Sequence, residues 1–123
     1  YEGFGWEVHP FLEVVKVDGV CYSHYFTSGV MGRAITSPNT LLNKKHVSCV
    51  MGHVQQDGIA SQYTGDGKRI TGIFAGAAYT HQEDYLGPQG NVHWRGIWML
   101  HSVANGEFEP MQVSLNYLEK KYG

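Results

Sequence analysis

The sequence predicts a mixed α/β domain in which strands outnumber helices. Asp-Gly or Asn-Gly pairs separate runs of β-forming residues at positions 18–19, 66–67 and 105–106, and such pairs are a strong signal for tight hairpins. The 123 residues include 16 glycines and only 16% charged residues, which favours strands and turns over long helices. One short helical pattern between two strands adds a crossover, so we expect a β-rich sandwich of mixed strands with one or two short helices.

The first elements are predicted to be the two strands of a hairpin. Valines precede Asp18-Gly19, and the apolar run 20–22 follows it before the strand ends at His24. The next segment, 26–36, contains two glycines and no regular period, which predicts a loop.

A short helix is predicted over residues 38–45. Ser37 is the expected N-cap, and Pro38 suits the first turn. Lys44 and Lys45 suit the last turn, where cations interact favourably with the helix dipole. The near-continuous apolar run 47–51 that follows predicts a strand buried on both faces.

Two further hairpins are predicted in the second half of the chain. One spans 58–76 around Asp66-Gly67, and the other spans 94–115 around Asn105-Gly106. A loop rich in Gly, Pro and polar residues is expected at 80–93 between them, and a short helix or tail at 116–123.

Composition and charge limit the classes of function and location. The formal net charge is −2, which does not indicate that the chain as a whole binds nucleic acid electrostatically. Cys21 and Cys49 lie in apolar runs, and we expect two reduced, buried thiols rather than a disulfide. We find neither an apolar run long enough to span a membrane nor a basic-then-apolar leader, so we expect a cytoplasmic protein, in the host cytoplasm if it is viral.

Histidine side chains follow two predicted strands at the point where each strand ends. His24 closes the run VCYSH, and His53 closes the run VSCVMGH. A strand–helix–strand crossover makes the two strands parallel and brings their carboxyl ends to the same edge of a sheet. We therefore expect the two imidazoles to lie close together, where they suit a metal ion. The alternative is a pair of ordinary hydrogen-bonded histidines at a strand edge.

Two neighbours of His53 have predicted roles at the same edge. Gly52 can take a positive φ and let the backbone approach a ligand closely. Gln55 points to the same side as His53 if the chain stays extended, and its amide oxygen can ligate a hard metal ion. The other five histidines are expected to be structural or exposed; they are His9, His46, His81, His93 and His101.

The order of these motifs resembles the C-terminal half of the calcineurin-like metallophosphoesterases, especially the small phosphoesterases of bacteriophages. The shared features are a strand ending in SHYF, a helix, an apolar strand ending in GHVQ, and then hairpins that include IFAGAAY. The resemblance implies a four-layer α/β sandwich around two divalent metal ions of Mn, Fe, Zn or Ni. It implies that His24 and His53 ligate one ion. Gln55 then stands where a second metal-binding histidine belongs, and Gly76 and Ala77 stand where a Gly-Ser turn falls.

The earlier motifs of that family are missing from this chain. Asp-x-His, Gly-Asp-x-x-Asp and Gly-Asn-His-(Asp/Glu) do not occur; GDGK lacks the second aspartate, and GNVH has an inserted valine. The resemblance places the bridging aspartate, the asparagine ligand and the catalytic histidine in those motifs. Because the first residue is Tyr1 rather than methionine, we expect residues 1–123 to be either a single domain or the C-terminal part of a metallophosphoesterase domain.

The leading hypothesis is a hydrolase of phosphomonoesters or phosphodiesters that acts only when the N-terminal half is supplied. Two metal ions would activate a hydroxide and hold the phosphate oxygens. Arg33, in the loop after His24, is a candidate phosphate contact, with a solvated loop charge as the alternative. The catalytic residues are expected outside this chain.

The substrate class and the rival hypotheses stay open. A nucleic acid, a nucleotide or a phosphoprotein would each supply the phosphate ester, and Tyr25, Phe26 and Trp94 are either rings for stacking on a base or core residues. One rival is a non-catalytic binding or assembly module that kept the fold and lost the metals. Another is a split enzyme in which a partner chain supplies the N-terminal half.

Overall fold

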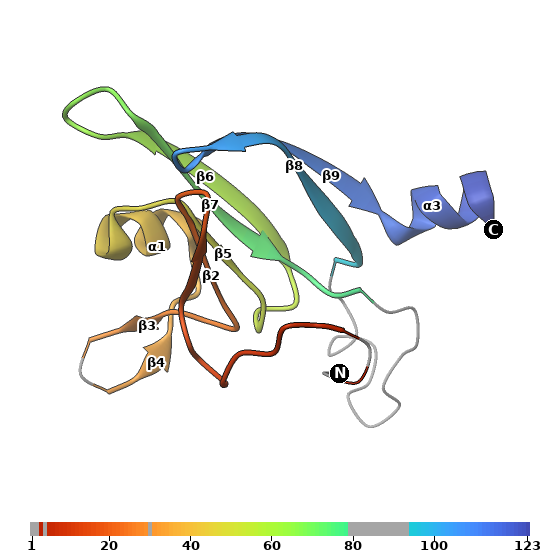
Figure 1. The fold of residues 1–123 in the computed structure, drawn as a ribbon. Coiled ribbons are helices and arrows are strands. Elements are labelled where there is room, and N and C mark those ends of the chain that lie inside the picture. The colour runs from red at the N-terminus through yellow and green to blue at the C-terminus, as the bar shows by residue number, and fades with distance from the viewer. Residues whose placement is uncertain (1–2, 4, 30, 79–93) are drawn as a thin grey trace.

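The computed structural model describes residues 3, 5–29, 31–78 and 94–123, and the loop expected at 80–93 lies outside them. The elements are the strands β1 (Val15–Val17), β2 (Val20–Ser23), β3 (Thr27–Ser28), β4 (Arg33–Ala34), β5 (Cys49–Met51), β6 (Asp57–Tyr63), β7 (Arg69–Ala75), β8 (Gly96–Ala104) and β9 (Glu107–Ser114), and the helices α1 (Pro38–Lys45) and α3 (Leu115–Tyr122). The predicted sheet-dominated mixed α/β class is therefore confirmed at this level (Figure 1).

A mixed sheet forms the centre of the domain, with the strand order β1-β2-β5-β7-β6. The three central strands β2, β5 and β7 are parallel to one another, and β1 and β6 add to the edges in antiparallel fashion. The predicted hairpins around Asp18-Gly19 and Asp66-Gly67 are both present, as β1–β2 and β6–β7. The third, around Asn105-Gly106, forms the separate two-stranded ribbon β8–β9.

Helix α1 has the bounds that the sequence predicts. Pro38 lies in its first turn, Lys44 and Lys45 lie in its last, and His46 ends it in the left-handed conformation with φ 57°. Ser37 is the N-cap residue with an extended backbone, as the sequence predicts, although its hydroxyl makes no capping hydrogen bond. The helix connects β2 to the parallel strand β5, as a crossover requires.

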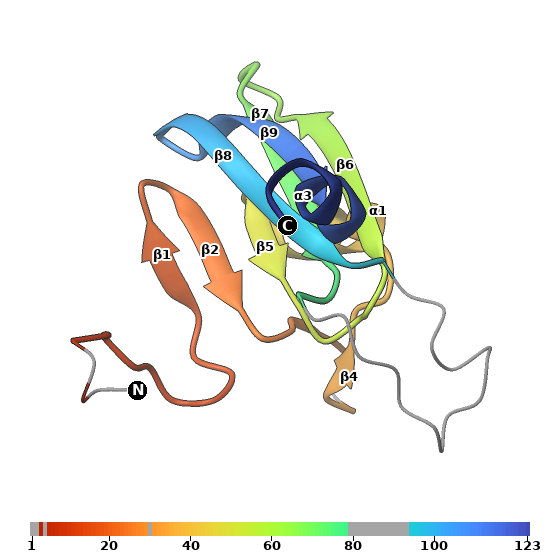
Figure 2. The same ribbon diagram turned by 90° about the vertical axis from the view of Figure 1, so that its right-hand side faces the viewer.

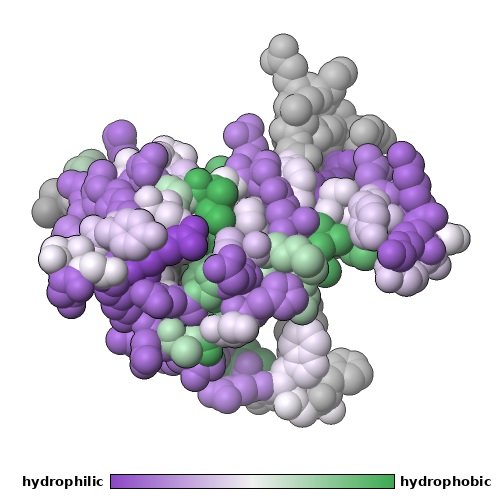
Figure 3. All heavy atoms as spheres, turned by 90° about the horizontal axis from the view of Figure 1, so that it is seen from above, coloured by the Kyte–Doolittle hydropathy of each residue, from purple (hydrophilic) through white to green (hydrophobic). Residues whose placement is uncertain are grey.

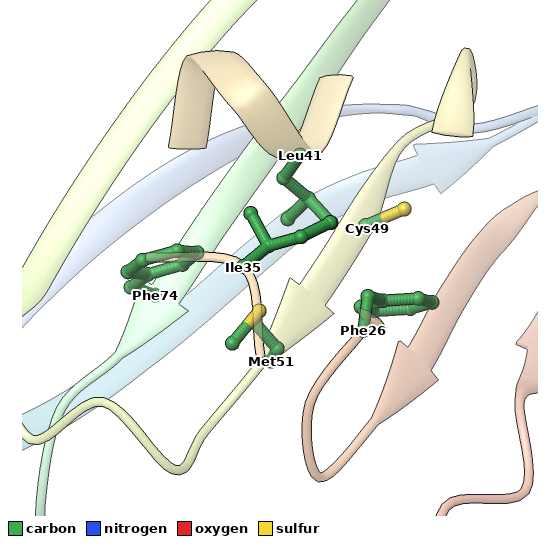
Figure 4. Close-up of a cluster of buried hydrophobic side chains, with 6 residues drawn as sticks. All are labelled: Phe26, Ile35, Leu41, Cys49, Met51 and Phe74. Carbon is green, nitrogen blue, oxygen red and sulfur yellow. The ribbon is translucent and has the colours of Figure 1, made fainter. Parts of the chain in front are cut away.

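The helix and the ribbon cover opposite faces of the sheet. Figure 2 shows α1 behind the sheet and β8–β9 in front of it. The side chains buried on the helix side are Phe26, Ile35, Leu41, Cys49, Met51 and Phe74 (Figure 4). Those buried on the ribbon side are Val20, Ile73 and Phe108. Successive residues of β5 contribute to both clusters, because strand side chains alternate between faces, so the predicted burial of this strand on both faces is confirmed.

The tips of two hairpins lie against each other at the end of the sheet opposite the histidines. A Cβ atom at Gly19 would overlap the backbone of Gly106, and the Gly106 N–H donates to the Asp18 oxygen at 2.8 Å. The buried Ser48 hydroxyl donates to the Gly106 oxygen at 2.5 Å and accepts from the Thr71 N–H at 3.0 Å. One side chain therefore joins the ribbon to the central sheet.

Two segments differ from the sequence prediction or add to it. The predicted loop 26–36 contains the small hairpin β3–β4, in which Thr27 pairs with Ala34. The C-terminal segment forms α3, which extends from the end of β9 and buries none of its residues (Figure 1). Hydrophilic side chains dominate the face seen in Figure 3, with small hydrophobic patches between the body of the domain and this helix. Within the described residues, neither helix has the length and apolar character needed to cross a bilayer.

We predict that Ser48→Ala lowers the free energy of unfolding by about 2–4 kcal/mol. The substitution leaves a buried acceptor at Gly106 and a buried donor at Thr71 without their partner, and each such group costs about 1–3 kcal/mol. Chemical denaturation measures the change. Ser102→Ala, at an exposed serine of β8, is the matched control and is expected to change stability by less than about 1 kcal/mol. Equal effects of the two substitutions would contradict this account of Ser48.

Candidate metal centre

His24 and His53 lie together at the carboxyl ends of β2 and β5, as the sequence predicts. The distance from His24 Nε2 to His53 Nδ1 is 3.2 Å, and the ring centroids are 5.1 Å apart with the planes at 73°. Both side chains are exposed. One nitrogen of the pair donates and the other accepts, and the tautomers of the two rings decide which of them is the donor.

The parallel register between β2 and β5 produces this proximity. Ser23 pairs with Met51, so each strand ends one or two residues before its histidine. The Gly52 N–H donates to the His24 oxygen at 3.0 Å, which continues the pairing past the ends of the strands. The two side chains therefore leave the backbone at adjacent points on one edge of the sheet.

The turn after β5 is made by His53 rather than by Gly52. His53 has φ 63°, and the Val54 N–H donates to the Gly52 oxygen at 2.7 Å. Gly52 is not among the residues with positive φ, and a Cβ atom there would meet only the His24 oxygen at 3.8 Å. The expected role of Gly52 as the flexible point is therefore wrong. Residues other than glycine rarely adopt the left-handed backbone conformation, which costs them about 1 kcal/mol or more. Such strain is frequently found at functional sites.

The predicted orientation of Gln55 depends on an extended chain after His53, and the turn at His53 contradicts that condition. The chain does not stay extended from His53 onward, and Gln55 is an exposed residue beyond the turn. Arg33 begins β4 and is also exposed. Within the described part of the chain, the ring contacts of the histidine pair are with Phe11 and Tyr25. The roles of Gln55 as metal ligand and of Arg33 as phosphate contact stay predictions.

Aromatic rings surround the two histidines. Tyr25 lies 4.8 Å from the His53 ring and 5.8 Å from the His24 ring, measured between centroids. Phe11 lies 5.4 Å from His24 and 6.3 Å from Tyr25. Sequence reasoning missed Phe11, because no periodic pattern connects the N-terminal segment to the strand ends.

The other two rings proposed for stacking on a base lie elsewhere. Phe26 is 5% exposed in the core beneath α1, so it is not available to a ligand. Trp94 packs against Trp98 at 6.0 Å and lies against Gly76, where a Cβ atom would come within 2.6 Å of its ring. Gly76 has φ 77°, and Ala77 donates its N–H to the Trp94 oxygen at 2.9 Å. The turn after β7 therefore contacts the segment that leads into β8.

The two imidazole nitrogens are spaced as ligands of one metal ion. A metal–nitrogen distance of about 2.0–2.1 Å places two imidazole nitrogens roughly 2.9–3.4 Å apart at octahedral or tetrahedral angles. The observed separation of 3.2 Å falls in that interval. In the residue next to His24, the buried Ser23 Oγ has no hydrogen-bond partner among the described residues. The same separation is that of the hydrogen bond between the two rings, so a metal ion at this pair stays a prediction.

The remaining histidines do not join this pair. His9 contacts Glu7 at 3.1 Å and Glu13 at 3.2 Å, and His46 ends α1. His101 is exposed on β8, while His81 and His93 lie outside the described residues. In the described ranges, no group of three or more His, Cys, Asp and Glu side chains is arranged to hold a metal ion.

A cavity of about 440 Å³ opens beside His24. Its lining residues come from the N-terminal segment on one side and from the ends of the parallel strands on the other. The residues that line it include His9, Phe11, Glu13, Tyr22, His24 and Val50. Burial raises the pKa of the Tyr22 hydroxyl, and the nearby Asp18 carboxylate adds to the effect, so this phenol stays neutral at physiological pH.

The two cysteines lie at the beginning of the same strands, away from the histidines. Cys21 pairs with Cys49 across β2 and β5, and both thiols are free, as the sequence predicts; Cys49 is buried, but Cys21 is only half-buried, so the predicted burial of Cys21 is wrong. Burial raises the pKa of the Cys49 thiol to about 12, with a further contribution from Cys21 that outweighs the opposing effect of Lys45. Cys49 is therefore a neutral core residue rather than a nucleophile or a ligand.

Comparison of the chain with protein-family models, with curated proteins and with solved structures finds no significant match. The metallophosphoesterase resemblance consequently rests on the sequence motifs and stays a prediction.

We predict that Cys49 resists alkylation in the folded protein and reacts only after unfolding. An unfolded thiol ionises near pH 9, whereas the Cys49 thiol keeps its proton up to about pH 12, so between these values the folded state binds one proton more and loses stability as the pH rises. Iodoacetamide labelling at pH 9, read by mass spectrometry, tests this. The half-buried Cys21 is the internal control and is expected to react first. Comparable labelling rates of the two cysteines in the folded protein would contradict the prediction.

Proposed function

We propose that this chain is the C-terminal part of a metal-dependent phosphoesterase, and that His24 and His53 hold one of its metal ions. The observation that supports the proposal most is the 3.2 Å separation of the two imidazole nitrogens at the carboxyl edge of parallel strands. That edge is where open α/β sheets bind ligands. The histidines also occupy the positions that the phosphoesterase motifs assign to ligands of a single ion.

The residues of this chain have a limited set of tasks in that reaction. The neutral imidazoles of His24 and His53 would bind the ion, and the backbone hydrogen bond from the Gly52 N–H to the His24 oxygen holds the two strand ends side by side. Tyr25 packs on His53 and restricts its orientation. Such a bound ion supplies Lewis acidity toward phosphate oxygens and lowers the pKa of coordinated water. The acidic ligands and the general acid belong to the N-terminal half of the domain in this proposal.

A second candidate is a non-catalytic module with a phosphoesterase-like fold. Gln55 favours it, because an amide stands where the second metal-binding histidine belongs, and the turn at His53 directs the chain away from an extended path. The hydrogen bond between His24 and His53 is then a structural contact that ties two strand ends together. The two candidates differ in whether a divalent ion displaces that hydrogen bond.

We predict that the chain binds about one Mn²⁺ or Zn²⁺ ion, and that His24→Ala and His53→Ala each weaken the affinity by at least about 10-fold. Each substitution removes one of two imidazole ligands, and even residues that only orient metal ligands contribute about 10–100-fold. Isothermal titration calorimetry measures the affinity. His101→Ala, an exposed histidine on β8, is the matched control and is expected to bind like the wild type.

The same variants separate the enzyme from the module when the N-terminal half is also present. The enzyme hypothesis expects metal-dependent hydrolysis of bis(p-nitrophenyl) phosphate that both histidine substitutions reduce by about 100-fold or more. Gln55→His is expected to increase metal affinity if Gln55 occupies a ligand position. Unchanged metal stoichiometry and unchanged hydrolysis in His24→Ala and His53→Ala would rule the proposal out. A folded wild-type chain that binds no metal ion would favour the non-catalytic module.

A further inference from the structure

Phe11 is an exposed aromatic side chain at the mouth of the cavity beside His24. It is 74% exposed, although large apolar side chains are usually buried. Its ring lies 5.4 Å from the His24 ring at a tilt of 46°. One edge of Phe11 therefore contacts the candidate metal centre, and much of the ring surface remains open to a ligand.

A strained turn holds Phe11 in this position. The Glu13 N–H donates to the Pro10 oxygen at 3.0 Å, which closes a turn with Phe11 and Leu12 at its tip. Leu12 has φ 66°, a conformation that costs a residue with a Cβ atom about 1–2 kcal/mol. Unfavourable backbone conformations of this kind are concentrated at ligand-binding sites. The turn therefore holds the Phe11 ring in place even though Leu12 adopts an unfavourable backbone conformation.

The cavity has the size and lining of a small-molecule site. Its volume of about 440 Å³ lies within the range of about 300–1,000 Å³ that is typical of ligand pockets. Val15, Val50 and Met51 give it apolar walls. His9 and Glu13 are also among its lining residues and form a hydrogen-bonded pair at 3.2 Å. A flat aromatic ligand with polar groups along its edge matches this combination of an open ring, apolar walls and a few polar side chains.

The charge of the lining favours a single nucleotide over a longer nucleic acid. Among the described residues, those that line the cavity include the carboxylate of Glu13 and no lysine or arginine. A polynucleotide is bound mainly through contacts from Lys and Arg to its phosphates. A mononucleotide needs no such contacts in the cavity if its phosphate lies outside, at the histidines.

We propose that this cavity binds the nucleobase of a nucleoside phosphate, with Phe11 as the stacking ring and the phosphate ester at the His24–His53 edge. The inference rests on the proposed function, because that function places the phosphate at the histidines. Of the rings suggested by the sequence, Phe26 lies in the core, Trp94 packs on the ribbon and Tyr25 packs on His53, whereas Phe11 lines the cavity. Phe11 selects for a base, and the metal centre selects for a phosphate.

The test compares ligands with and without a base in the presence of Mn²⁺. AMP and GMP are expected to bind the chain at least about 10-fold more tightly than ribose 5-phosphate or inorganic phosphate. Phe11→Ala is expected to weaken nucleotide binding on the order of 10-fold, because stacking one base on one aromatic ring has an effect of roughly this size or larger. The same substitution should leave the binding of ribose 5-phosphate unchanged, and Phe11→Trp should retain nucleotide binding.

Tyr63→Ala is the matched control, because Tyr63 is 72% exposed on β6 and is not among the residues that line the cavity. It is expected to bind nucleotides like the wild type, and circular dichroism confirms that each variant is folded. Equal binding of AMP and ribose 5-phosphate, or nucleotide binding that Phe11→Ala does not change, overturns the inference. A phosphotyrosine peptide that binds more tightly than the nucleotides and depends on Phe11 also overturns it.

A metal-free titration with adenosine separates this inference from the proposed function. Adenosine has no phosphate, so its binding reports on the cavity alone. Adenosine binding that Phe11→Ala weakens supports the base site even if the chain binds no metal at His24 and His53, in which case only the proposed function fails. Metal binding that depends on both histidines, without any effect of Phe11→Ala on AMP or adenosine, leaves the proposed function standing and removes the nucleobase inference.

Discussion

The parallel pairing of β2 with β5 determines where the functional side chains of this domain lie. Each of the two strands ends within two residues of a histidine, and the register that pairs Ser23 with Met51 brings both ends to one edge. Helix α1 makes this pairing possible, because it carries the chain back to the start of a parallel strand and covers the sheet with Leu41 and other side chains that are fully buried. A shift of this register would separate the imidazoles.

The opposite end of the sheet holds that register in place. The tips of the β1–β2 and β8–β9 hairpins touch there, and Ser48 connects them to the central strand β7 through two buried hydrogen bonds. The buried Cys49 thiol of β5 lies between the two ends, and its raised pKa keeps it neutral. The domain thus has a rigid, closed end and an open end, and the histidines, Phe11 and the cavity all lie at the open end.

The parts of this arrangement that follow local rules could be predicted from the sequence. The Asp-Gly and Asn-Gly turns, the bounds of α1, the free cysteines and the proximity of His24 to His53 are confirmed, because turn chemistry and the crossover rule act over short stretches. The position of Phe11 could not be predicted, since a contact between a turn and a distant strand end leaves no periodic pattern. The positive φ lies at His53 rather than at Gly52, where the sequence predicts it, because glycine is the usual residue in that conformation; the Gly52 N–H instead donates to the His24 oxygen.

The central claim is that His24 and His53 ligate one metal ion through the two nitrogens that face each other. Anomalous diffraction from crystals soaked in Mn²⁺ or Zn²⁺ tests it directly, because it locates the ion without relying on activity. The account predicts one anomalous peak about 2.0–2.2 Å from both His24 Nε2 and His53 Nδ1, with the direct hydrogen bond between them lost. A map with no peak between these nitrogens, or with a peak on only one of the two rings, would contradict it.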